Sequence, residues 1–313
     1  MIVVEQIAGL ALVQDLGRPG HARLGVAPSG AFDVGAHLAA NAAVGNAAGA
    51  STIEVLLGPI VLRARRACVL AVTGADGDVR VDGLAVLGGR PFTLLPGATL
   101  TVGVARDGVR RYVAVRGGFG VDPVLGSRAR DTLAELGPPP LAVGDEVPVG
   151  DDVATPLRAA AAGATRDRGT DGSGAAAPGA LRKVVLEVLP GSRPEYFADD
   201  ALAALASEVL TVSDRCDRVA VRLEGAIVRR ADEQRTPELP SEGLVAGAIQ
   251  VPPSGEPVVM GPDHPLTGGY PVLAVLTRRS LDALAQVRPG TRVRLVPRHH
   301  GALPRANEAP VPR

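Results

Sequence analysis

The sequence predicts a mostly β protein with barrel-like closure and a few short helices. Short runs rich in Val, Leu and Ile alternate with Gly/Pro turns along most of the 313-residue chain. The runs at residues 219–223 and 292–296 alternate apolar with polar side chains, as half-buried strands do. Strands and helices do not alternate regularly, which argues against a doubly wound parallel sheet. We expect barrel-like closure because it hides sheet edges.

The expected strands are bounded by turns such as Pro96-Gly97 and Pro289-Gly290, where Pro and Gly favour a tight reversal of the chain. In chain order the main expected strands are Leu10–Val13, Thr52–Leu57, Val69–Thr73, Thr99–Val104, Arg111–Val115, Val184–Leu189, Val219–Leu223, Val272–Leu276 and Arg292–Val296.

Helical signals are few. Asp33 is a suitable N-cap for a helix that ends near Val44, before a Gly-Asn pair. A second helix is expected over Phe197–Ala206, and a third over Ser280–Val287 with its first residue as the cap.

A change of composition near the middle divides the chain. Residues 151–180 are mainly Ala, Gly, Thr and Asp with almost no large apolar side chain, which is typical of a flexible linker. We therefore expect an N-terminal β lobe over residues 1–150 and a C-terminal β lobe over residues 181–298. Residues 299–313 are expected to form a disordered tail.

The charge composition excludes several functions. Lys+Arg and Asp+Glu both number 33, so the formal net charge is +0, and neither nucleic acid nor an anionic membrane surface is expected as a partner. Lys183 is the only lysine. It follows Arg182 and lies in neither a P-loop nor the context of a biotin carrier, so we expect no covalent biotin on this chain.

Cysteine content and hydropathy argue against a metal site, a secreted protein and a membrane-spanning protein. Cys68 and Cys216 belong to no CxxC or Cys/His cluster, so no metal site is predicted. The sequence shows no signal peptide and no apolar run of about 18 residues. A cytoplasmic protein is the resulting expectation.

Polar side chains concentrate in Gly/Pro-rich segments that are far apart in sequence. In the first, Asp15 and Arg18 follow a strand; they either line a pocket or form a turn in which Asp15 accepts backbone N–H groups and pairs with Arg18. The second interpretation is favoured. Ser29 and Asp33 lie at an expected helix N-terminus, which suits an anionic ligand, although capping alone explains Asp33.

The distant segment at residues 263–271 is the strongest local candidate for a site. Asp263 could act as an acid or base, and the Gly268-Gly269 pair lets backbone approach a ligand closely. His264 beside it is either functional or simply solvated. The cluster at residues 214–218, with two Asp and two Arg around Cys216, is interpreted as surface ion pairing.

Together these segments resemble, in order, the carboxyltransferase-domain family called allophanate hydrolase subunit 2. The resemblance also extends to part of the carboxyltransferase domain of urea carboxylase, and it covers both halves of the chain. The matching stretches are VQDLGRPG (13–20), GVAPSGAFD (25–33), LAANAAVGN (38–46), IEVLLGP (53–59), VTGAD (72–76), YVAVRGGF (112–119), VLGSRARD (124–131), VLPG (188–191), DRVAVRLEG (217–225), LPSEGLVAGAIQVPPSGEPVV (239–259) and LTGGYP (266–271).

The resemblance implies a fold, partners and a reaction. It implies two cyclophilin-like β-barrel lobes and a B-type partner of the same broad fold, acting with an A-type subunit. The implied reaction is the ATP-dependent opening of 5-oxoproline to glutamate by a 5-oxoprolinase, in which this chain is the C-type member and the ATP site could be shared with the B-type partner. Two alternatives stay open: a regulatory partner of a kinase-inhibitor-like protein, and a carboxyltransferase acting on urea- or allophanate-type amides.

The resemblance also implies site residues, which fall in the matched motifs or, for Asp263, between two of them. The catalytic candidates are Ser29, Asp33 and Asp263. The substrate-binding candidates are Arg18, Gln250, Thr267, Gly268, Gly269 and Tyr270. The chain departs from the family pattern at residues 132–140 (TLAELGPPP) and at Cys216, where Ser is usual.

Overall fold

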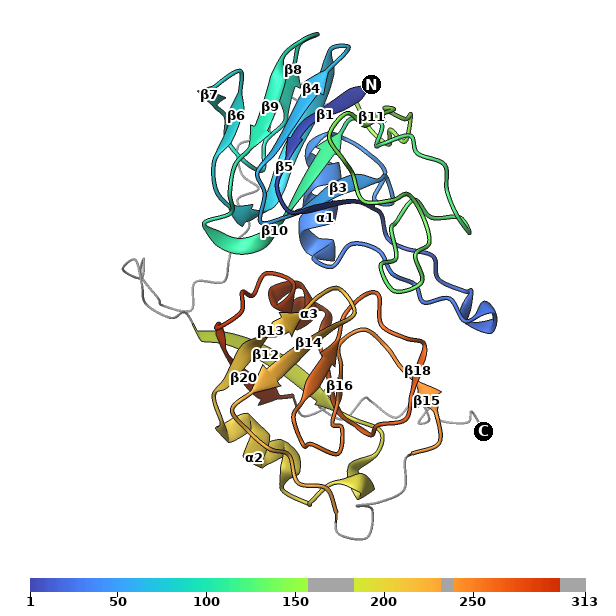
Figure 1. The fold of residues 1–313 in the computed structure, drawn as a ribbon, viewed down its shortest axis with the longest axis vertical. Helices are drawn as coiled ribbons and strands as arrows, with labels where there is room; N and C mark the ends of the chain where they lie inside the picture. Colours follow the sequence, from blue (N-terminus) through green and yellow to red (C-terminus); the bar gives the residue numbers. More distant parts are fainter. Residues whose placement is uncertain (157–182, 232–238, 299–313) are drawn as a thin grey trace, which may run out of the picture.

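The computed structural model describes residues 1–156, 183–231 and 239–298. Figure 1 shows two β-rich halves, the N-terminal one in blue to green and the C-terminal one in yellow to red. The fold is mostly β, as the sequence predicts. The predicted tail and nearly all of the predicted linker lie outside the described residues, and the lobe boundaries stay predictions.

The N-terminal half contains two antiparallel sheets. The six-stranded sheet has the order β11-β1-β4-β9-β6-β7, with strands at Glu146–Val147, Ile2–Ile7, Ile60–Ala64, Thr99–Val102, Val79–Val81 and Leu84–Ala85. The five-stranded sheet has the order β2-β3-β10-β5-β8, with strands at Leu10–Gln14, Thr52–Leu56, Asp107–Val115, Cys68–Asp76 and Phe92–Leu94. Buried side chains of both sheets, such as Leu62 and Val72, form one apolar core.

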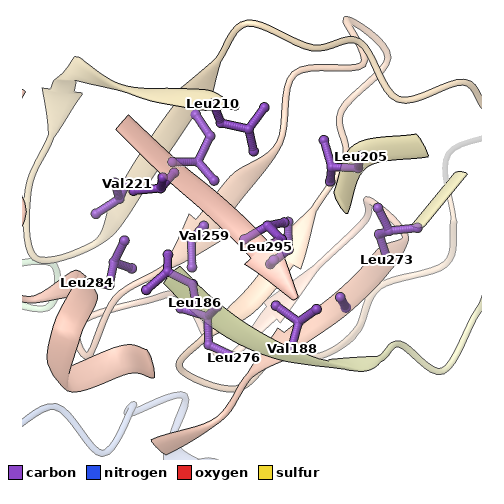
Figure 2. Packing of buried hydrophobic residues seen from close by; sticks show 14 of the residues in the cluster. Leu186, Val188, Leu205, Leu210, Val221, Val259, Leu273, Leu276, Leu284 and Leu295 are labelled. Atoms are coloured by element: carbon purple, nitrogen blue, oxygen red, sulfur yellow. The ribbon is translucent and has the colours of Figure 1, made fainter. Parts of the chain in front are cut away.

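The C-terminal half is a closed barrel. Its strand order is β12-β19-β16-β17-β14-β13-β20, with strands at Lys183–Pro190, Val272–Leu276, Ala248–Gln250, Val258–Met260, Ala220–Glu224, Leu210–Cys216 and Arg292–Pro297. Parallel pairing of β12 with β20 closes it, and the other neighbours are antiparallel. Leu186, Leu210 and Leu295 pack inside, as Figure 2 shows. In this half of the protein, closure confirms the expectation that the sheet edges are hidden.

Short helices and a small ribbon complete the described chain. The α-helices are α1 (Val34–Ala43), α2 (Ala201–Ser207) and α3 (Arg278–Leu284), the 3-10 turns are Ala22–Leu24 and Pro194–Tyr196, and the ribbon pairs β15 (Glu242–Gly243) with β18 (Thr267–Gly268). The Asp33 carboxylate caps α1 by accepting from the Ala36 N–H at 2.8 Å, as predicted. The predicted cap of α3 was wrong: the helix begins earlier, because the Thr277 hydroxyl accepts from the Ser280 N–H.

The two halves are packed together through charged and apolar contacts. Phe32, from the N-terminal half, is buried in the core cluster of the barrel, and the Arg110 guanidinium lies 4.5 Å above its ring. Helix α1 also contacts α3. Among the described residues, no helix has both the length and the apolar character needed to cross a membrane.

Candidate functional site

The two Gly/Pro-rich turns near the N-terminus pack directly on each other. The Arg18 N–H donates to the Pro28 carbonyl at 2.7 Å, and the Ala31 N–H donates to the Asp15 carbonyl at 2.9 Å. Gly17 has a φ of +82°, and a Cβ there would lie 2.3 Å from the Pro28 oxygen. Glycine is therefore required for this packing.

The predicted turn chemistry at Asp15 is half correct. Its carboxylate accepts from the Gly17 N–H at 2.7 Å, as expected. The predicted pairing with Arg18 is wrong, because the Arg18 side chain instead donates to the Val124 and Ala129 carbonyl oxygens. No local pattern indicates these partners, because Val124 and Ala129 lie more than 100 residues away.

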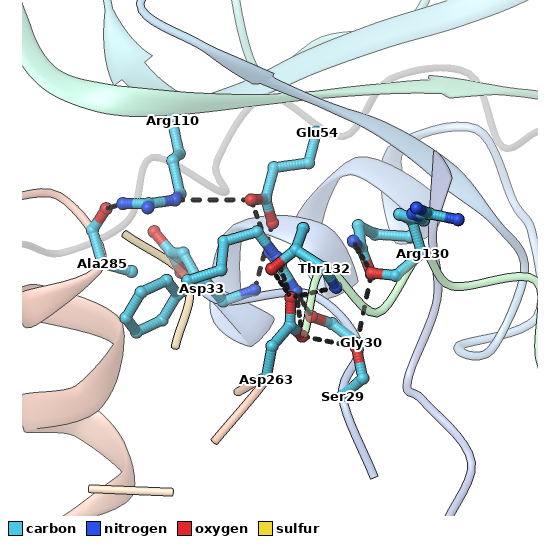
Figure 3. Close-up of polar contacts among 12 residues, drawn as sticks. Ser29, Gly30, Asp33, Glu54, Arg110, Arg130, Thr132, Asp263 and Ala285 are labelled. Carbon is cyan, nitrogen blue, oxygen red and sulfur yellow. Dashed lines mark hydrogen bonds and ion pairs between the residues drawn. The ribbon is translucent and has the colours of Figure 1, made fainter. Parts of the chain in front are cut away.

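Ser29 and Asp263 come together although 234 residues separate them. The Ser29 hydroxyl donates to Asp263 Oδ1 at 2.6 Å, and Thr132 donates to Oδ2 from its N–H at 2.9 Å and its hydroxyl at 2.7 Å. Ser29 adopts a φ of 56°, in the left-handed region that non-glycine residues seldom occupy. Figure 3 shows Ser29 beside Asp263 and the backbone of Arg130. The structure thus joins the two segments that the sequence singles out.

Arg218 is the centre of this contact. It is buried, and its Nε lies 2.8 Å from Asp263 Oδ2, its Nη1 2.6 Å from Glu54 Oε1, and its Nη2 2.6 Å from the Gly30 carbonyl oxygen. The prediction of surface ion pairing was wrong for Arg218, because the barrel turns its side chain toward the other half. It holds for Arg215, which is exposed and lies 3.6 Å from Glu224.

Glu54 extends the network into the N-terminal sheet. Its Oε2 accepts from the Tyr112 hydroxyl at 2.7 Å and from the Phe32 N–H at 3.1 Å, and Arg110 Nε lies 3.3 Å from Oε1. The Tyr112 hydroxyl accepts in turn from the Asp33 N–H at 2.8 Å. Figure 3 shows the contact between Glu54 and Arg110. Two carboxylates and two guanidinium groups therefore neutralise one another away from water.

The electrostatics of the network fix its protonation. Burial raises the pKa of Glu54 and Asp263, but the Arg218 charge and the hydrogen bonds that each carboxylate accepts together outweigh it, and they hold both pKa values below their ordinary range. Burial, together with the Glu54 charge, raises the pKa of Tyr112 well above its ordinary value. The carboxyls are thus ionised and Tyr112 neutral at pH 7. Asp263 is fully shielded from solvent, so no ligand reaches its carboxylate in this structure.

Asp33 lies at the same boundary. Beyond capping α1, its Oδ2 accepts from Gln286 Nε2 at 2.8 Å. The Gln286 amide oxygen accepts from the N–H groups of Val109 and Arg110, each at 3.0 Å. Asp33 therefore helps to hold the barrel on the N-terminal sheet.

The remaining predicted residues form a second group around β18. Gln250 is buried, and its Nε2 donates to the Tyr270 carbonyl at 2.9 Å. A Cβ on Gly268 would lie 2.6 Å from the same Nε2, so glycine is needed for this close approach. Thr267 and Tyr270 are exposed at this loop, while Gly269 is half-buried between them. Gln250 thus shapes a loop that presents Thr267 and Tyr270 to solvent.

Sequence reasoning missed five residues of the network: Glu54, Arg110, Tyr112, Thr132 and Arg218. One signal was available, since Glu54 is a lone carboxylate inside the apolar run at residues 53–57. A charge in a strand that is otherwise apolar indicates a buried partner.

The neighbouring His and Cys residues are not exposed reactive groups. His264 is buried, and its Nδ1 lies 2.8 Å from the Pro265 carbonyl oxygen, so the solvated alternative was wrong. Burial raises the pKa of the Cys216 thiol. Within the part of the chain that the structure describes, no three His, Cys, Asp or Glu side chains are grouped to hold a metal.

Comparison with known proteins identifies relatives over most of the chain. The chain is 32% identical to the C subunit of 5-oxoprolinase from Escherichia coli, covering 91% of this chain and 87% of that protein. It is also 32% identical to the C subunit of 5-oxoprolinase from Haemophilus influenzae, covering 94% and 90%. It is 29% identical to urea amidolyase of Saccharomyces cerevisiae, with 91% of this chain but 16% of that protein covered.

Solved structures share the fold. The protein TTHA0988 matches with a TM-score of 0.76 and 34% identity over 94% of this chain, which spans about half (55%) of its length. The urea amidolyase of Kluyveromyces lactis matches with a TM-score of 0.80 at 24% identity, covering 95% of this chain and 18% of that one. The family model described as carboxyltransferase domain, subdomain A and B, matches residues 24–297. The chain therefore belongs to this carboxyltransferase-domain family.

Proposed function

We propose that this chain is the C-type subunit of a heteromeric, ATP-dependent 5-oxoprolinase. One observation carries the proposal: the identity to two proteins named as the C subunit of 5-oxoprolinase extends over about nine-tenths of all three chains. Urea amidolyase matches at lower identity and as a small part of a much longer chain.

The proposed reaction explains why ATP is needed. A lactam carbonyl is a poor electrophile, so transfer of the terminal phosphoryl group of ATP to its oxygen makes carbon more reactive and creates a leaving group. Water adds at that carbon, the ring C–N bond breaks as a proton passes to nitrogen, and a further water releases phosphate and leaves glutamate. Charge that develops on oxygen requires guanidinium or backbone N–H donors.

ATP is a substrate of the assembled complex in this proposal. This chain has no P-loop, and its only lysine, Lys183, is exposed at the start of β12. A nucleotide site shared with a B-type partner is therefore more consistent with the sequence than a site within this chain. An A-type subunit is the third component of the complex, which we place in the cytoplasm.

The network residues take a positioning role in this proposal. Asp263 and Arg218 set the spacing between the two halves, and Ser29 ties the turn that carries Arg18 to the segment that leads to Thr267. The ionised Asp263 is retained as a catalytic candidate for a state in which the halves separate.

The test is a coupled assay on this chain co-purified with its B-type and A-type partners. ATP hydrolysis and glutamate release should rise together when 5-oxoproline is added, and both should stop when ATP is omitted. The 5-oxoprolinase complex of Escherichia coli serves as a positive control. An intact complex that binds all partners yet releases no glutamate overturns the proposal and supports a regulatory role.

Carboxyl transfer to a urea-type amide is the second candidate. The family description and the 29% identity to urea amidolyase favour it. Because this chain offers no biotin-carrier lysine, a separate carrier protein must supply the carboxyl group. Transfer of labelled carboxylate from a biotinylated carrier to urea, in the absence of 5-oxoproline turnover, would select this function.

A further inference from the structure

Arg18 is a buried guanidinium that the protein leaves incompletely partnered. The residue is 2% exposed. Its Nε donates to the Val124 carbonyl at 3.3 Å and its Nη2 to the Ala129 carbonyl. Its Nη1 is buried and has no hydrogen-bond partner among the residues that the structure describes. Each terminal nitrogen carries two N–H groups, so two strong donors are unused.

The other buried arginines show that this is unusual within the described residues. Six buried side-chain atoms there have no hydrogen-bond partner; four are arginine Nε atoms, one is the Gln14 amide oxygen, and Arg18 Nη1 is the single terminal guanidinium nitrogen. Arg111 is equally buried, yet its Nη1 bonds the Asp78 carbonyl and its Nη2 the Asp76 and Val104 carbonyls, all at 3.0–3.1 Å. Burial alone does not leave a terminal nitrogen unpartnered.

The carboxylates on the same loops accept hydrogen bonds from other groups. Asp15 accepts from the Gly17 N–H, the Ser127 hydroxyl and the Arg128 N–H, at 2.6–2.7 Å. Asp131 accepts from the Leu133 and Ala134 N–H groups, each at 2.9 Å. Arg18 therefore keeps a positive charge that no carboxylate among its described contacts balances, and an unbalanced buried charge is costly.

Two further features are found in the loops that carry Arg18 and its carbonyl partners. The Gln14 amide donates to the Arg130 carbonyl at 2.8 Å, and Gln14 Oε1 and Arg130 Nε are both unpartnered, so half of the six unpartnered atoms lie in this group.

The backbone of these loops is also strained. Of the five non-glycine residues with positive φ in the described chain, Ser29, Leu125 and Glu135 lie on them, at 56°, 52° and 55°. Ser29 and Glu135 contact Arg130, and the Leu125 carbonyl contacts His21. Such strain is concentrated at functional sites in proteins.

We propose that Arg18 Nη1 binds one oxygen of a small oxyanion, a carboxylate or a phosphate group. A guanidinium presents its terminal N–H groups in the planar geometry that either anion fits, and the charge-assisted hydrogen bond balances the buried charge. The identity of the anion rests on the proposed function, whereas the site itself does not. In the complex, the carboxylate of 5-oxoproline or a phosphate of the nucleotide would occupy this site.

The experiment titrates the full-length chain separately with 5-oxoproline and with inorganic phosphate, against chloride at equal ionic strength. Calorimetry gives Kd, and side-chain ¹⁵N–¹H spectra of arginine-labelled protein report on the Arg18 guanidinium directly. We expect at least one ligand to shift the Arg18 signals, and the responding ligand identifies the source of the oxyanion. Arg18→Met should weaken that ligand's binding by about tenfold or more, whereas the matched control Arg111→Met should leave its Kd unchanged.

The spectra of the unmodified chain keep the test decisive even if Arg18→Met does not fold. Unshifted Arg18 signals with both ligands, or equal Kd values for the two variants, overturn the site. Binding through Arg18 without ATP-dependent glutamate release keeps the site and removes the proposed function. If the complex releases glutamate but Arg18→Lys changes neither the KM for 5-oxoproline nor the KM for ATP, the proposed function is kept and the site is overturned.

Discussion

Two buried arginines of this protein have opposite surroundings. Arg218 contacts Glu54, Asp263 and the Gly30 carbonyl, so each of its three nitrogens has a partner. Among the described residues, Arg18 contacts two carbonyl oxygens and no carboxylate, and one of its terminal nitrogens has no hydrogen-bond partner.

The different surroundings indicate different roles: the Arg218 charge stabilises the fold, whereas the Arg18 charge is available to a ligand. Burial lowers the pKa of Arg218, but the Glu54 and Asp263 charges outweigh it and raise that pKa. That guanidinium is satisfied within the fold and joins the two halves. The Arg18 guanidinium is satisfied only in part, which costs stability unless an anion supplies the missing contact. The contrast leads to four predictions.

The largest expected effect is the loss of the fully partnered arginine. Arg218→Met leaves Glu54 and Asp263 buried without their shared counter-charge, so the free energy of unfolding should fall by about 3–5 kcal/mol. Urea unfolding at pH 7 measures it. The control is Arg215→Met, three residues earlier and exposed, which should change little. Equal effects of the two variants would mean that the network does not hold the halves together.

Acidification should weaken the same network. Glu54 and Asp263 have folded-state pKa values below their ordinary 4.5 and 3.8, so their stabilisation is present above those values and is lost as pH falls through the folded ones. Unfolding free energies should therefore fall steeply below about pH 4. Glu54→Gln should flatten this acid limb. If Glu54→Gln leaves the pH dependence of the unfolding free energy unchanged, other carboxylates cause the loss of stability in acid.

Removing the partly partnered arginine should cost less. In anion-free buffer Arg18→Met loses two hydrogen bonds to carbonyls and strands no carboxylate, so we expect a loss of about 1–3 kcal/mol. The same unfolding assay compares it with Arg218→Met. The gap between the two variants should narrow once the ligand that binds at Arg18 is present. If Arg18→Met loses as much stability as Arg218→Met in anion-free buffer, the two arginines do not differ in the way that their contacts suggest.

The smallest effect is expected at an exposed pair. Arg65 and Glu146 form an ion pair between the β4 end and β11, with side chains 59% and 38% exposed. Water and salt screen such a pair, so Arg65→Ala should leave the unfolding midpoint unchanged within error. A measurable loss there would show that surface pairing matters in this protein more than its geometry suggests.

Local patterns predicted several of the strands and the first helix correctly. β3, β12, β19 and β20 agree with the predicted runs to within about one residue, because period-two alternation and Gly/Pro turns are local properties. The Asp33 cap was also readable from neighbouring residues. The start of α3 was not, since Thr277 and Ser280 are both good caps and the local sequence does not decide between them.

The sequence alone determined the fold class, the family and the segments that carry polar chemistry, since composition, periodicity and motif order lie along the chain. It placed Ser29 and Asp263 among the candidates but offered no reason to join them. Only the tertiary structure decided that Arg218 is a buried link while Arg215 is exposed, and that Arg18 contacts no carboxylate among the described residues. Partners and burial depend on contacts across more than 100 residues, which no local pattern records.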